Sequence, residues 1–144
     1  GQQMISKTNQ EDRIMSASKV KEIQQQIAYW IFEHAPRNWS KCCIYMELLL
    51  IDEDMDNSWT TVWFDSNNKE MIDIEISALN KSNMKELFVD LNNVIAEIDE
   101  RWTTCKMKVT SDGKYNFDFG YDRPPRLKWE TADDLLYHPD YASF

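Results

Sequence analysis

Residues 105–121 read CKMKVTSDGKYNFDFGY, a pattern that predicts a β-hairpin. Apolar and polar side chains alternate on both sides of Asp112-Gly113, which is the pattern of two half-buried strands. An Asp-Gly pair readily adopts the positive φ angles of a type I′ turn, so an antiparallel hairpin is predicted. One face of this hairpin is apolar and needs a cover; it carries Cys105, Met107, Val109, Tyr115, Phe117, Phe119 and Tyr121.

The residues before the hairpin supply that cover. An apolar stripe at helical spacing runs from Met84 to Trp102, and Ser82 is expected to cap its first turn. A second amphipathic helix is predicted earlier, capped by Ser16 or Ser18 and ended by Pro36, with Val20, Ile23, Ile27, Trp30 and Ile31 as its apolar positions. Three strand-like runs lie between the two helices, at 41–50, 58–64 and 71–76, and an acidic turn is expected at 52–57.

The order of these elements is α-βββ-α-ββ plus a C-terminal tail, which predicts an α+β fold. We expect two layers: a five-stranded, mainly antiparallel sheet with both amphipathic helices on one face. The other face is expected to be wet, or to receive the tail or a partner; it would carry Asp73, Glu75, Lys106, Lys108, Asn116 and Asp118.

Three regions are predicted along the chain. Residues 1–15 are polar and expected to be flexible, and residues 1–3 look like the remainder of an epitope tag. Residues 16–123 are expected to form a single α+β domain. Residues 124–144 follow Pro124-Pro125 and are expected to be a tail that packs on the domain or extends from it.

Charge narrows the choice of partner. The 144-residue chain has a net charge of −9, and residues 41–144 contain 11 basic and 21 acidic side chains. Such a surface repels phosphate backbones and anionic lipid, so no direct nucleic-acid or membrane binding is expected, and a basic protein partner is favoured. The alternative is that the charge serves solubility alone.

Cysteine use indicates a reducing compartment. The three cysteines do not suggest a disulfide framework, because adjacent Cys42 and Cys43 on a strand would point to opposite faces. The first 20 residues lack an apolar signal region, so a cytoplasmic protein is expected. A monomer is favoured, and an adaptor domain that dimerises through its open sheet face is the alternative.

The sequence shows no catalytic constellation. Its two histidines lack a paired nucleophile, its three glycines do not make a phosphate loop, and its Cys and His spacings do not fit zinc. The acidic run at 52–56 lacks the glycine and the distal glutamate of a calcium loop. We therefore expect no cofactor, no metal and no enzyme. The alternative is a small enzyme with an unrecognised carboxylate site at Asp73, Glu75 or Asp118.

Acidic and aromatic side chains together suggest a protein-binding surface. Trp59 and Trp63 share a strand face opposite to Val62 and Phe64, and are expected to face away from the main core. The alternative to an exposed binding surface is that the tail folds back and covers the aromatic rings. Exposed Trp and Tyr anchor interfaces, while charges speed the encounter. The predicted partner-binding residues are therefore Asp52, Glu53, Asp54 and Asp56 for steering, and Trp59, Trp63, Tyr121 and Trp129 for contact.

The hairpin stretch DGKYNFDFGYD, residues 112–122, resembles the signature hairpin of YezG-like immunity proteins. The earlier part is also similar, with an amphipathic helix, then Pro36-Arg37-Asn38-Trp39, then a strand at 44–47. The similarity covers about residues 17–123 and leaves out the 52–56 loop and the 124–144 tail.

This resemblance implies a bacterial cytoplasmic antitoxin that protects the cell from a polymorphic or contact-dependent growth inhibition toxin. Such a protein would bind its cognate toxin domain, often a basic nuclease at a C-terminus, and neutralise it by occluding the active site or substrate groove. The family supplies no catalytic residues.

Overall fold

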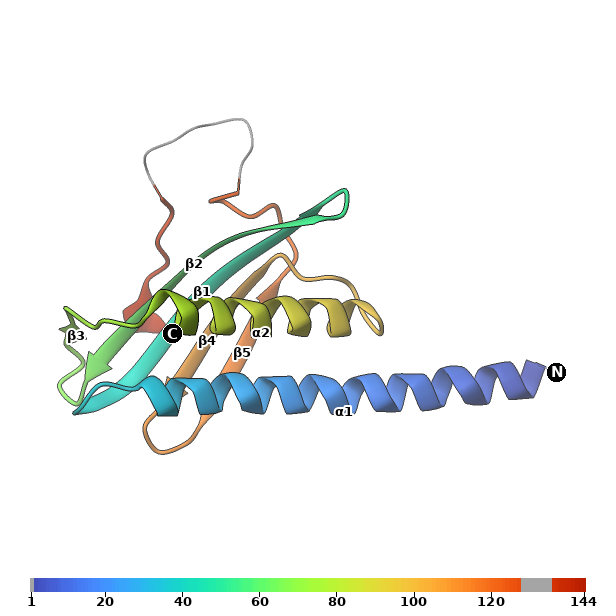
Figure 1. The fold of residues 1–144 in the computed structure, drawn as a ribbon, viewed down its shortest axis with the longest axis horizontal. Coiled ribbons are helices and arrows are strands. Elements are labelled where there is room, and N and C mark those ends of the chain that lie inside the picture. Colours follow the sequence, from blue (N-terminus) through green and yellow to red (C-terminus); the bar gives the residue numbers. More distant parts are fainter. Residues whose placement is uncertain (1, 128–135) are drawn as a thin grey trace.

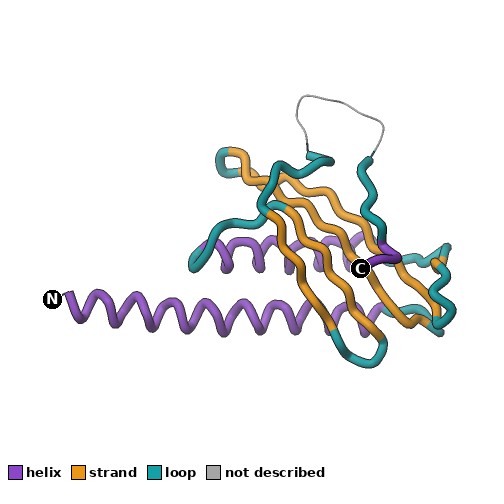
Figure 2. The backbone as a smooth tube through the Cα atoms, turned by 180° about the vertical axis from the view of Figure 1, so that it is seen from behind, coloured by secondary structure: helices purple, strands orange, loops and turns teal. Residues whose placement is uncertain are grey.

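The computed structural model describes residues 2–127 and 136–144. Its five strands form one antiparallel sheet in the order β3-β2-β1-β4-β5, and both long helices lie side by side on one face of it (Figures 1 and 2). The predicted two-layer α+β architecture is confirmed. The elements are α1 (Gln2–His34), β1 (Trp39–Ile51), β2 (Asp54–Asp65), β3 (Glu70–Met71), α2 (Ala78–Ala96), β4 (Thr104–Thr110), β5 (Tyr115–Gly120) and a 3-10 turn, η1 (Tyr141–Ser143).

The main core lies between the helices and the sheet. The helical stripe predicted for α1 is confirmed, since Ile23, Ile27, Trp30 and Ile31 are buried there. The stripe predicted from Met84 to Trp102 is confirmed only as far as Ile95, because α2 ends at Ala96 and Trp102 reaches the core from beyond the helix. The sheet contributes alternate residues of its two central strands: Cys42, Ile44, Met46 and Leu48 from β1, and Cys105, Met107 and Val109 from β4. Burial of these apolar side chains is the main force that joins the two layers.

A second, smaller core lies on the opposite face of the sheet. It contains Cys43, Val62 and Phe64, and the rings of Tyr141 and Phe144 pack against it. The C-terminal segment thus crosses the face of the sheet that the helices leave open (Figure 2). Cys42 and Cys43 point into different cores, as their adjacency on a strand predicted. This face of the sheet is therefore covered in part by the tail and is not exposed to water alone.

Both helices begin at different residues from those predicted. Helix α1 starts at Gln2, well before Ser16 and Ser18, and no glycine or proline interrupts residues 2–35. Helix α2 starts at Ala78, because Ser77, and not Ser82, accepts the N–H of Asn80 at 3.2 Å. Neither helix, over the residues described, is long and apolar enough to cross a membrane.

The predicted strand at 71–76 is wrong beyond its first residue. Only Glu70 and Met71 pair with β2, and the left-handed φ of 61° at Asp73 interrupts the extended backbone. Ile72 is 76% exposed, while Ile74 and Ile76 pack on the main core from a loop. Asp73 and Glu75 therefore do not lie on the open face of the sheet.

Candidate functional site

The β1–β2 hairpin projects past the rest of the sheet (Figure 1). Strand β4 pairs with β1 only from Lys41 to Glu47, so residues 48–57 continue as a two-stranded ribbon. The expected acidic turn at 52–57 is shorter than predicted: the chain turns at Asp52-Glu53, and Asp52 adopts a φ of 55°. An aspartate tolerates this left-handed conformation better than most residues.

Four exposed carboxylates crowd the tip of this ribbon: Asp52, Glu53, Asp54 and Asp56, here named the acidic tip. Residues 42–68 contain no lysine or arginine. Within the part of the chain that the structure describes, none of the four carboxylates forms an ion pair. Their negative charge is therefore available to a partner.

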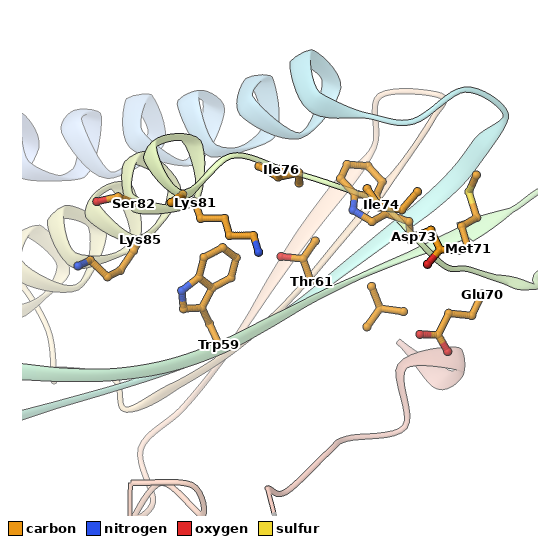
Figure 3. A pocket seen from close by; sticks show the side chains of 13 residues that line it. Trp59, Thr61, Glu70, Met71, Asp73, Ile74, Ile76, Lys81, Ser82 and Lys85 are labelled. Atoms are coloured by element: carbon orange, nitrogen blue, oxygen red, sulfur yellow. The ribbon is translucent and has the colours of Figure 1, made fainter.

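A groove of about 600 Å³ lies between β2 and the first turns of α2. Trp59 and Thr61 point from β2 toward Lys81 and Ile76 (Figure 3). The Thr61 hydroxyl oxygen is buried and has no hydrogen-bond partner among the described residues. The groove thus combines apolar side chains with this hydroxyl, two lysines and two carboxylates: Lys81, Lys85, Glu70 and Asp73.

The expectation that Trp59 and Trp63 face away from the main core is wrong. The two rings do lie opposite to Val62 and Phe64, but it is Val62 and Phe64 that face the tail. Trp63 is only 2% exposed and packs edge-to-face on Trp39, with ring centroids 5.6 Å apart. Both faces of β2 are covered here, so alternation alone does not show which side holds the larger core.

The other predicted contact rings are placed differently. Tyr121 is 45% exposed and follows β5. Thr104 pairs with both Glu47 and Gly120, so Tyr121 lies at the same end of the sheet as the acidic tip. Trp59 is half-buried and lines the groove at the β2 edge instead. Trp129 lies outside the described residues. The roles of these residues in partner contact stay predictions.

A buried carboxylate fastens the tail to the sheet. Glu47 is fully buried, and its Oε1 accepts the backbone N–H groups of Arg126 at 2.8 Å and Leu127 at 3.1 Å. The Tyr45 hydroxyl donates to the other carboxylate oxygen. Burial, followed by the hydrogen bond to Glu47 and its negative charge, raises the pKa of Tyr45 well above its usual range. Tyr45 therefore stays a neutral hydrogen-bond donor.

The Arg126 side chain extends this attachment. Its guanidinium lies 4.8 Å from the centroid of the Tyr45 ring and donates to Thr60 Oγ1 at 2.9 Å. Its Nε donates to the carbonyl oxygen of Tyr137 at 2.7 Å, so one side chain holds the second half of the tail against the sheet. These partners are all protein groups, and the cluster acts as a structural clamp.

The carboxylates considered for an alternative enzyme site, Asp73, Glu75 and Asp118, do not lie together in the structure. Asp73 and Glu75 lie in the loop between β3 and α2 at one edge of the sheet, and Asp118 lies on β5 at the other edge. In the described part of the chain, no three His, Cys, Asp or Glu residues group so as to hold a metal ion.

The cysteines are free thiols. All three are buried. Burial raises the pKa of Cys42 and Cys105, and raises that of Cys43 to about 11. A thiol with a raised pKa is a poor nucleophile.

Sequence reasoning missed the groove and the clamp. The clamp had a signal: Cys43, Tyr45 and Leu49 are apolar at alternate positions, opposite to the apolar positions already assigned to the core. A strand that is apolar on both faces is covered on both faces. Glu47 in the middle of such a strand indicates a buried, hydrogen-bonded carboxylate.

Comparison with known families identifies the class of protein. Residues 20–141 match the family described as immunity protein YezG-like. No curated protein matches the chain. The family match shows that this chain is an immunity protein. The family implies a cognate toxin as the partner and suggests a non-enzymatic role.

The chain belongs to the YezG-like immunity protein family. The match corrects the extent expected from the resemblance, since it includes the acidic tip and reaches into the tail as far as residue 141. Tyr141, where the match ends, packs on the second core, so its inclusion agrees with the fold; Phe144, which packs on the same core, lies beyond the match.

Proposed function

We propose that this immunity protein neutralises a basic, nuclease-type toxin domain by occluding its active site or substrate groove with the acidic tip. The observation that carries the proposal is the set of four exposed carboxylates, without an ion pair among the described residues, on a ribbon that projects past the sheet. A nuclease concentrates positive charge where it holds the phosphate backbone. Carboxylates on a narrow ribbon are suited to occupy the same positive groove.

On this proposal, the acidic tip speeds association with the toxin and Tyr121 stabilises the complex once it has formed. The charge of the acidic tip attracts a basic partner over roughly one Debye length, about 8 Å in physiological salt, which raises the association rate. Tyr121, at the same end of the sheet, offers an exposed ring that loses water on contact. On this proposal the protein acts in the bacterial cytoplasm as a monomer against a polymorphic or contact-dependent toxin, and catalyses no reaction itself.

The test uses the toxin domain encoded beside this chain's reading frame. Its nuclease activity is measured while this protein is added, and binding of the inactivated toxin to its nucleic acid is measured in parallel. We expect complete inhibition at a 1:1 ratio and loss of nucleic-acid binding. A complex in which the toxin still binds nucleic acid would contradict occlusion, and the absence of any complex at low salt would contradict the pairing itself.

A further inference from the structure

Strand β2 has an open edge over most of its length. It lies between β1 and β3, but β3 pairs only with Trp63 and Phe64 (Figure 1). From Asp54 to Val62, no described strand lies on the outer side of β2. Natural edge strands are commonly protected by charged side chains, proline or a bulge. Residues 54–62 contain neither lysine nor proline, and their charged residues, Asp54 and Asp56, are confined to the tip.

The hydrogen-bond pattern shows which main-chain groups face outward. Leu48 lies opposite Asn57, yet it donates its N–H to the carbonyl of Thr103 on the far side of β1, so this pair exchanges no hydrogen bonds. Asn57 therefore directs its own N–H and C=O away from β1.

The hydrogen bond at the Asp65 end of β2 also shows that the odd-numbered residues direct their main-chain groups away from β1. Asp65 donates its N–H outward to Lys69 at 2.9 Å, and the direction alternates residue by residue. Met55, Asn57, Trp59 and Thr61 thus present their main-chain groups at the open edge, and no described backbone group bonds to them.

The surroundings of this edge differ at its two ends. The acidic tip lies beside Met55 and Asn57. The groove lies beside Trp59 and Thr61, where apolar side chains adjoin the Thr61 hydroxyl, which has no partner in the part of the chain that the structure describes. At the groove the charges of Lys81 and Lys85 are offset by those of Glu70 and Asp73, so the groove does not select a charged side chain. The acidic tip favours a positive one.

We infer that the β2 edge from Met55 to Thr61 receives an extended segment of the toxin as a sixth strand. Basic side chains of this segment lie beside the acidic tip, and an apolar side chain enters the groove. Main-chain hydrogen bonds supply affinity in this mode of binding, and the alternate side chains supply specificity. That the sixth strand comes from the toxin rests on the proposed function. That the β2 edge is open rests on the strand pairing alone.

The test compares two substitutions at one exposed position. Asn57→Pro removes an outward N–H without removing a bond to β1, whereas Asn57→Ala keeps that N–H. The probe is the neighbouring toxin domain with its catalytic residues substituted. We expect N57P to weaken binding about tenfold or more and N57A to leave it nearly unchanged. In the unsubstituted protein, the amides of Asn57, Trp59 and Thr61 should exchange rapidly when free and slowly in the complex.

The outcomes separate this inference from the proposed function. If the complex forms and inhibits the toxin, but the three amides exchange as in the free protein and N57P binds as N57A does, the edge is not the docking site and occlusion still stands. If no complex forms, both fail. If the free chain is a dimer that N57P dissociates, the edge pairs with a second copy, and the inference is overturned.

Discussion

The Glu47 carboxylate accepts the backbone N–H of Arg126 at 2.8 Å, across 79 positions of the chain. This bond joins the middle of the sheet to the start of the tail. Leu127 and Tyr45 also donate to the same buried carboxylate. A buried acceptor with three donors leaves all three unsatisfied when it is removed, so its loss costs more than one ordinary hydrogen bond.

Glu47→Ala should therefore lower the free energy of unfolding by about 2–4 kcal/mol. Glu47→Gln should cost less, because its amide oxygen can still accept from the backbone, although its NH₂ group cannot accept from Tyr45. Urea denaturation measures both. Tyr45→Phe is the matched control, since it removes only one donor. A loss below about 0.5 kcal/mol for Glu47→Ala would show that the clamp does not stabilise the fold.

The tail should also protect one specific thiol. Cys43 lies under Tyr141 and Phe144, whereas Cys42 and Cys105 lie in the main core. Deletion of residues 136–144 should let a thiol reagent modify one cysteine in the native protein, where the intact chain shows none. Cys43→Ala in the shortened chain should abolish that reaction. Reaction of all three thiols would instead mean that the tail holds the main core together.

Thiol burial makes stability depend on pH. An unfolded cysteine ionises near pH 8.5, but burial raises the pKa of Cys43 in the folded protein to about 11. A raised folded pKa contributes stability that is fully present below about pH 8.5 and is lost as pH rises toward 11. We expect Cys43 to account for a loss of about 1–2 kcal/mol between pH 8 and pH 10.

The Cys43→Ala variant isolates this contribution. The difference in unfolding free energy between the unsubstituted protein and this variant should shrink as pH rises from 8 to 10. The raised pKa of Tyr45 also lowers stability as pH nears 10, but both proteins contain Tyr45, so its contribution cancels in the difference. A difference that stays constant with pH would contradict the raised pKa of Cys43.

The parts of the fold that were predictable are those set by local pattern. Asp112-Gly113 predicts a turn, and the stripe beginning at Met84 predicts a helix face, without reference to distant residues. The turn is not the expected type I′, because only Gly113, and not Asp112, has a positive φ. The alternation of Ile72, Ile74 and Ile76 predicted a strand, but two of these side chains can reach the core from a loop as well. Alternation correctly indicated that Ile74 and Ile76 reach the core but not that Ile72 is exposed, and only a partner strand decides whether the backbone pairs.

The candidate site was only partly predictable for the same reason. The charge of the acidic tip is visible in the sequence, because exposed carboxylates cluster there. The open edge of β2 is not visible in the sequence, because that edge is open only since β3 ends at Met71. The orientation of Trp63 was mistaken because the tail, distant in sequence, covers the face of the sheet opposite to it.

Neutralising the acidic tip should slow association with the toxin. At low ionic strength we expect the association rate to fall about 10- to 100-fold, and in high salt hardly at all, because screening removes the same attraction. The melting temperature should change little, since the four carboxylates are exposed. Neutralising four exposed acids of α1 changes the net charge equally and controls for it: Glu11, Asp12, Glu22 and Glu33. Equal rate losses in the two variants would show that net charge, and not the tip, steers the encounter.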